Sequence, residues 1–129
     1  MSFRVLICGS RTWDDQKSIQ RYVDSLPDDT VVIEGEARGA DSIARACAEQ
    51  RGLEVLPFPA DWKRYGKAAG SIRKTQMLME GRPNMVVAFV YDLESSKGTK
   101  NMVDKARTQG VPILVIPEAL SREADNGQG

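Results

Sequence analysis

Three segments of the chain combine glycine with hydroxyl or cationic side chains, a combination suited to binding an anion. GSR (9–11) ends the apolar run RVLICG, GEARGAD (35–41) ends TVVIEG, and SSKGT (95–99) follows NMVVAFV. Glycine lets the backbone approach an anion closely, and hydroxyl and guanidinium groups donate hydrogen bonds to phosphate. These segments are either plain turns at strand ends or parts of one phosphate site.

The segment GEARGAD carries the most specific expectations. A helix that begins near Gly39 would offer free N–H groups and the positive end of its dipole to an anion, and Arg38 would add a fixed charge. Asp41 is either a first-turn carboxylate that stabilises this helix or an acceptor for a ribose hydroxyl. The segment lacks the GxGxxG pattern of dinucleotide-binding proteins.

A longer segment, DWKRYGKAAGSIRK (61–74), places aromatic and basic side chains after the third apolar run. The basic residues form either a solvated charge run or one flank of the site. For Trp13, Trp62 and Tyr65 two roles are open. Each either stacks on a nucleobase or covers the edge of the sheet.

The absence of histidine restricts the possible chemistry. It excludes Ser-His and Cys-His nucleophile systems and HExxH metal sites, so carboxylates, lysine, arginine, hydroxyls or backbone dipoles must act instead. Cys8 and Cys47 match neither a redox CxxC nor a zinc pattern, which indicates two reduced, buried thiols. We expect no metal and no cofactor.

Five short apolar runs alternate with helical patterns along the chain. The runs are mostly continuous, as in strands buried on both faces of a parallel sheet. We expect a Rossmann-like, doubly wound α/β fold of about five parallel strands, in an order such as 3-2-1-4-5, with helices on both faces. Its ligand would bind beyond the carboxyl ends of the strands. The expected strands are 4–9, 30–35, 54–59, 84–90 and 111–117, and the expected helices are about 14–26, 40–51, 67–81 and 98–110.

The length and the charge of the chain further limit its domain organisation and its possible partners. A chain of 129 residues predicts one domain, here 1–117, followed by a polar, flexible tail at 118–129. A net charge of zero disfavours general attraction to nucleic acid or to an anionic membrane. No apolar run is long enough to span a bilayer and no signal peptide pattern is present, so the cytoplasm is the expected location.

Four segments in order resemble a known family. GSR-x-W, G-x-ARGAD, PADW-x-x-Y-G-x-AAG-x-IR and a GT-containing helix start are similar to the YspA-type, YpsA-related family of the SLOG superfamily, over residues 4–116. The resemblance implies a Rossmann-like domain that binds nucleotides or nucleotide-derived ligands at the strand edge. It also implies a homodimer. The superfamily includes LOG-type phosphoribohydrolases, DNA-processing proteins, and sensor domains of prokaryotic and phage systems.

Comparison with the LOG-type enzymes separates binding from catalysis. RKTQM (73–77) reproduces their RKxxM segment, so Arg73 resembles their active-site arginine. Their PGGxGTxxE segment is only partly kept, as Gly98 and Thr99, and Asn101 and Met102 stand in place of the acidic pair. An amide cannot take up a proton as a carboxylate does. Phosphate anchoring therefore carries over from the resemblance, and LOG-type hydrolysis does not.

Three functions follow as hypotheses. The first is a sensor or binding module for a nucleotide or nucleotide-derived phosphorylated ligand. The second is a hydrolase of nucleotide N-glycosidic bonds, with Glu36, Asp41 or Asp61 supplying the carboxylate and Arg73 as a further catalytic candidate. The third, single-stranded DNA binding, is disfavoured by the neutral charge. The expected ligand contacts are Gly9, Ser10, Arg11, Gly35, Arg38, Gly39, Asp41, Asp61, Trp62, Arg73, Gly98 and Thr99.

Overall fold

Five parallel strands form one sheet in the order β3-β2-β1-β4-β5. The computed structural model describes residues 2–117, so the tail expected at 118–129 lies outside the described residues. The fold class and strand order predicted from the apolar runs are confirmed. The strands are β1 (Arg4–Gly9), β2 (Val31–Glu34), β3 (Glu54–Pro57), β4 (Met85–Phe89) and β5 (Ile113–Ile116).

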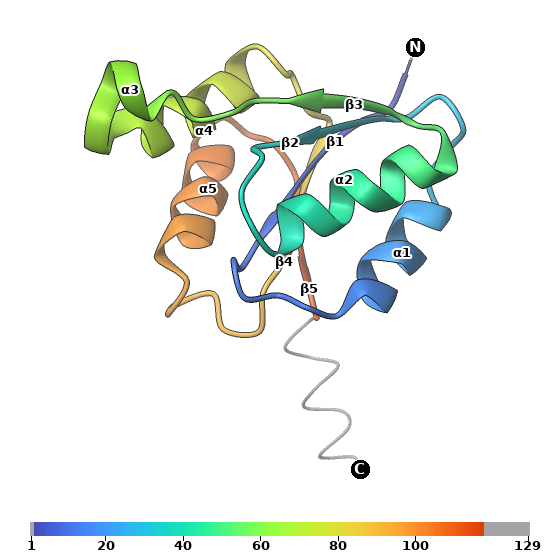
Figure 1. Cartoon of the computed structure of the whole chain (residues 1–129). Coiled ribbons are helices and arrows are strands. Elements are labelled where there is room, and N and C mark those ends of the chain that lie inside the picture. The colour runs from blue at the N-terminus through green and yellow to red at the C-terminus, as the bar shows by residue number, and fades with distance from the viewer. Residues whose placement is uncertain (1, 118–129) are drawn as a thin grey trace.

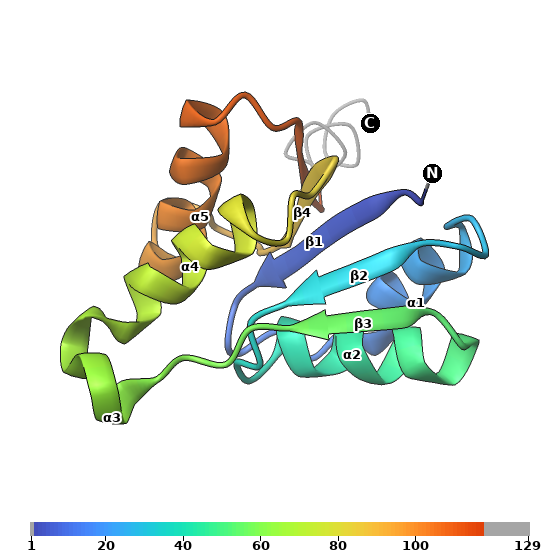
Figure 2. The same cartoon turned by 90° about the horizontal axis from the view of Figure 1, so that it is seen from above.

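Helices cover both faces of the sheet (Figures 1 and 2). α1 and α2 lie together on one face, and α4 and α5 lie on the other. Within residues 2–117, no helix combines the length and apolar character needed to cross a membrane. The helices are α1 (Gln16–Asp24), α2 (Ala40–Arg51), α3 (Trp62–Tyr65), the 3₁₀ turn η1 (Gly66–Ala68), α4 (Ala69–Met79) and α5 (Lys97–Thr108).

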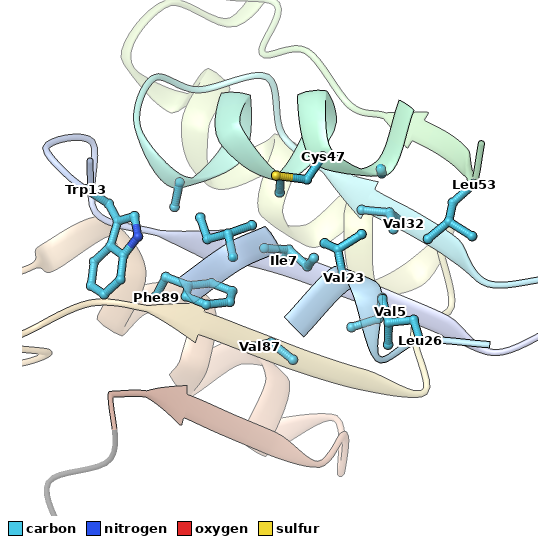
Figure 3. Packing of buried hydrophobic residues seen from close by; sticks show 14 residues of the cluster. Val5, Ile7, Trp13, Val23, Leu26, Val32, Cys47, Leu53, Val87 and Phe89 are labelled. Atoms are coloured by element: carbon cyan, nitrogen blue, oxygen red, sulfur yellow. The ribbon is translucent and has the colours of Figure 1, made fainter. Parts of the chain in front are cut away.

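Alternate residues of the central strands point to opposite faces of the sheet and pack into two separate hydrophobic cores. Val5 and Ile7 pack under α1 and α2, as Figure 3 shows, whereas Leu6 and Cys8 pack under α4 and α5. Because both faces are covered, every position of β1 between its ends is buried, which explains the unbroken apolar run. Cys47 belongs to the first core, so the two cysteines lie on opposite faces of the sheet. Both are free and buried, as predicted.

The helix expected at about 67–81 is present as η1 and α4, but a short additional helix, α3, precedes it after β3. Asp61 caps a short α3 by accepting a hydrogen bond from the Arg64 N–H at 3.0 Å. Gly66 then takes φ 56° and ψ −133°, which ends α3, and the turn η1 leads from there directly into α4 at Ala69. Figure 2 shows α3 lying away from the sheet, between the end of β3 and the start of α4.

Trp13 covers the end of the sheet, which is one of the two roles expected for it. Its side chain is 3% exposed and its indole stacks on Tyr91 with ring centroids 4.4 Å apart. It meets Phe89 edge-on at 5.7 Å, and its Nε1 donates to the Asp15 carbonyl at 3.0 Å. Trp62 is 53% exposed, so the two tryptophans differ sharply in burial.

This difference predicts unequal costs of removing the two indoles. Trp13→Ala should lower the free energy of unfolding by about 3–5 kcal/mol, because it empties a buried site between β4 and the loop after β1. Trp62→Ala, the matched control, should cost less than about 1 kcal/mol. Urea unfolding followed by circular dichroism measures both, and equal losses would contradict the burial described here.

Candidate functional site: an electropositive cavity at the strand edge

A cavity of about 440 Å³ lies where the strand order reverses, at the carboxyl ends of β1 and β4. This is the position at which open α/β sheets bind ligands. Its walls come from the loop after β1, the β2–α2 connection, α4 and the start of α5. The lining residues are Cys8, Gly9, Ser10, Arg11, Thr12, Ala37, Asp41, Arg73, Lys74, Met77, Ser95, Ser96, Lys97, Gly98, Thr99 and Met102.

The loop after β1 packs directly against the first turn of α2. The Ala40 N–H donates to the Ser10 carbonyl at 3.1 Å. Gly39 has φ 72°, and a Cβ there would overlap the Ser10 carbonyl oxygen and come within 2.5 Å of that of Arg11. Only glycine combines this backbone conformation with such close approach. Gly39 therefore acts by bringing two loops together, and it does not line the cavity itself.

Asp41 holds the β2–α2 connection in place. Its carboxylate Oδ2 accepts hydrogen bonds from the Gly35 N–H at 3.0 Å and the Ala37 N–H at 3.4 Å. The side chain is 6% exposed, and burial raises its pKa while these two hydrogen bonds and the charge of Arg73 oppose the rise. Asp41 thus braces the loop that precedes its helix, and it also lines the cavity.

Arg73 reaches the same connection from α4. Its Nη1 donates to the Gly35 carbonyl at 2.7 Å, and the residue is 8% exposed. Its Nε has no hydrogen-bond partner among the described residues. A Cβ on Gly35 would lie 3.1 Å from the Asp41 carboxylate and 3.2 Å from Arg73 Cδ, so the glycine leaves the space that both side chains use. Burial lowers the pKa of Arg73.

Lys74 carries a positive charge to the beginning of α5. Its Nζ lies 3.6 Å from where a Cβ of Gly98 would stand. The N-cap residue Ser96 makes no side-chain capping bond, and the first N–H groups of a helix have no partner within the helix. An ammonium group beside the positive end of a helix dipole is unfavourable unless an anion joins them. Burial lowers the Lys74 pKa, and the charges of Arg73 and Arg11 lower it further.

Glu34, at the end of β2, is a buried acid that the sequence analysis did not single out. It is 0% exposed, its Oε1 accepts from the Glu36 N–H at 2.8 Å, and its Oε2 has no partner among the described residues. Burial raises its pKa to about 7. The signal was available, because an acid within the run TVVIEG occupies a strand position that is otherwise apolar. Glu34 does not line the cavity.

Of the residues predicted to contact ligand, the structure brings seven to the cavity wall: Gly9, Ser10, Arg11, Asp41, Arg73, Gly98 and Thr99.

Gly35 and Gly39 stand behind the cavity wall. Arg38 is exposed and lies off the wall. Asp61 and Trp62 do not join the site, because the chain leaves the strand edge after β3 to form α3. Glu36 forms an ion pair with Arg45 at 3.1 Å, also off the cavity wall.

The prediction of ligand contacts omitted Lys74 and Met77. Both follow Arg73 on α4, and residues three or four apart lie on the same side of a helix. Met77 lies four residues after Arg73, and Lys74 lies three residues before Met77. This helical spacing in the sequence could have indicated both residues. In residues 2–117 no group of three acidic or cysteine side chains is arranged to hold a metal ion.

Comparison with known proteins shows the family of this chain. The family described as YspA, cpYpsA-related SLOG matches residues 3–65. The Gene 61 protein of Mycobacterium phage D29 is 38% identical over 120 residues, covering 86% of this chain and 94% of that protein. The chain belongs to the YspA, cpYpsA-related SLOG family.

The fold also resembles that of a solved DNA-processing protein. The structure of DNA processing protein A (DprA) from Streptococcus pneumoniae superimposes with a TM-score of 0.68 at 18% sequence identity. The match covers 92% of this chain and 51% of that one, so this chain spans about half the length of DprA. At this identity the likeness concerns the fold alone.

The raised pKa of Glu34 predicts a specific dependence of stability on pH. The folded chain keeps a proton on Glu34 that the unfolded chain releases above about pH 4.5, so this group destabilises the fold as pH rises from about 4.5 to about 7. Glu34→Gln removes this penalty. Its stability relative to the parent should be about 2–3 kcal/mol more favourable at pH 8 than at pH 4.5.

Urea unfolding at the two pH values measures this difference, and comparison with the parent cancels the other titrating groups. Glu54→Gln, an exposed position on β3, serves as the control and should keep a constant difference from the parent. A constant difference for Glu34→Gln as well would show that Glu34 has the same pKa in the folded and the unfolded chain.

Proposed function

We propose that this protein binds a nucleotide or a nucleotide-derived phosphorylated ligand in the cavity at the carboxyl edge of the sheet, as a sensor or binding module of a phage or prokaryotic system. The observation that carries the proposal is the position of the Lys74 ammonium beside the uncapped beginning of α5. Two sources of positive potential meet there, and Arg11 and Arg73 contribute from the other walls. A phosphate group at this point would compensate the Lys74 ammonium and accept hydrogen bonds from the first N–H groups of α5.

The family supports the same ligand class. SLOG relatives are expected, by the resemblance described above, to bind nucleotides at this edge of the sheet. The cavity volume of about 440 Å³ is within the range of small-molecule sites. The neutral net charge disfavours the extended phosphate contacts that DNA binding requires, so a small ligand is the better fit.

Lys74 provides the sharpest test. Lys74→Met keeps most of the side-chain volume but removes the charge, and should weaken binding of adenosine 5′-monophosphate and inorganic phosphate by about 10- to 100-fold. Isothermal titration calorimetry measures the affinity. Lys67→Met, at an exposed position of η1, should bind as the parent does.

The outcome distinguishes this site from binding elsewhere. A parent protein that binds these ligands while Lys74→Met binds them equally well would move the ligand to another surface. Failure of the parent to bind any phosphorylated ligand at millimolar concentration would overturn the proposal itself.

A second candidate function is hydrolysis of a nucleotide N-glycosidic bond, and one observation favours it. Asp41 is a buried carboxylate on the cavity wall, and burial raises its pKa, as is common for catalytic acids and bases. Of the three carboxylates considered from sequence, only Asp41 lines this cavity. Met102 occupies the wall where the resemblance would place an acid of the LOG type.

The enzyme reading predicts release of free base from nucleoside monophosphates. Chromatography after prolonged incubation detects it, and Asp41→Asn should reduce the rate at least 100-fold if this carboxylate acts on the substrate. Binding of the nucleotide without any release of base would reject the hydrolase and leave the binding module.

Homodimerisation remains a prediction from the family. At the end of α4, Met77 and Leu78 are 4% and 7% exposed within the α4–α5 core, whereas Met79 is exposed and could contact a second copy. Light scattering in solution measures the oligomeric state.

A further inference from the structure

The cavity wall lacks the side chains with which proteins usually recognise a nucleobase. No aromatic residue and no asparagine or glutamine is among the described residues that line it. Trp13 is buried against Phe89 and Tyr91, and Trp62 lies on α3, outside the cavity. Base recognition ordinarily combines stacking on aromatic rings with hydrogen bonds to the base edges. The wall therefore offers a base no aromatic ring for stacking and no side-chain amide for pairing with its edge.

Apart from Ala37, the apolar side chains of the wall contain sulfur. Cys8, Met77 and Met102 line the cavity, and all three are nearly fully buried. Methionine has three rotatable bonds and adapts its shape to its neighbour, so a surface of this kind accepts different groups and specifies none. The binding free energy of a base placed against this surface would therefore depend little on which base it is.

The polar part of the wall suits the remaining parts of a nucleotide. Lys74, Arg11 and the start of α5 form a cationic region suited to phosphate. Asp41 is the one carboxylate among the described lining residues. Its Oδ2 accepts from the Gly35 and Ala37 N–H groups, and its Oδ1 accepts no hydrogen bond from the described side chains or loops. Sugar hydroxyls are donors of the kind that a carboxylate oxygen accepts.

We infer that the cavity recognises the phosphate and the sugar hydroxyls of its ligand and is indifferent to the base. The ligand class is a pentose 5-phosphate, with or without a nucleobase attached. This inference rests on the proposed function, since it assigns the phosphate of the same ligand to the cationic region, the sugar hydroxyls to Asp41, and the base to the surface formed by Cys8, Met77 and Met102.

Calorimetry on the parent protein tests the inference with a matched set of compounds. The set is inorganic phosphate, methyl phosphate, ribose 5-phosphate, the 5′-monophosphates of adenosine, guanosine, cytidine and uridine, and unphosphorylated adenosine. Ribose 5-phosphate and the four nucleotides should agree in affinity within about threefold. Ribose 5-phosphate should bind at least tenfold more tightly than methyl phosphate, which has no hydroxyl groups to offer, and adenosine should not bind.

Two results would overturn the inference. One is a nucleotide that binds tenfold more tightly than ribose 5-phosphate, which would show that its base is read. The other is methyl phosphate binding as tightly as ribose 5-phosphate, which would show that the hydroxyls are not read. Failure of every phosphorylated compound to bind would instead reject the proposed function, so the two failures are distinguishable.

Asp41→Asn locates the hydroxyl contact. The variant should lose most of the preference for ribose 5-phosphate over methyl phosphate, yet bind methyl phosphate at least as well as the parent because a negative charge has left the cavity. Preservation of the full preference would remove Asp41 from the inference. Because the substitution also touches the loop brace, circular dichroism and urea unfolding accompany the titration. Should the variant prove unfolded, the methyl phosphate comparison on the parent still decides the question.

Discussion

The hydrogen bonds of the Asp41 carboxylate to the backbone between β2 and α2 are the interaction on which the cavity depends. Two N–H groups of this connection, those of Gly35 and Ala37, are satisfied by Asp41, and the one between them, that of Glu36, is satisfied by Glu34. Three consecutive amides are thereby fixed by two buried carboxyl groups. Because the connection is held in this way, the Gly35 carbonyl accepts the hydrogen bond from Arg73. This bond anchors a cationic side chain of α4 beside the end of β2.

The same arrangement explains how cations can gather in a partly buried place. Arg73 is tied to a carbonyl and lies within the field of Asp41, so one of the positive charges is compensated from within the protein. Within residues 2–117 no acidic side chain pairs with Lys74, and its neighbours Arg73 and Arg11 oppose its protonation. Electrostatic strain of this kind concentrates at functional sites, because a ligand relieves it on binding.

Sequence patterns predicted the sheet well, because continuous apolar runs reflect burial on both faces and the strand order follows from short right-handed connections. Arg73, Gly98 and Thr99 were also found, through their resemblance to known motifs. The position of Asp61 and Trp62 was not predictable, since nothing local in PADW shows that the chain turns away from the edge before α4. The role of Gly39 was likewise hidden, because its contacts to Ser10 and Arg11 arise only from the packing of two distant loops.

The walls of the cavity come from both halves of the chain. The loop after β1 and the start of α2 supply one side, and α4 and α5 supply the other, on the opposite face of the sheet. Around the cavity the two sides are joined mainly through the sheet and the contact of Arg73 with Gly35. A ligand held by Arg11 and Lys74 together would act as a crosslink between these sides. Occupancy of the site would then increase the resistance of the fold to local opening, so the rigidity of this edge of the domain would depend on the concentration of the ligand.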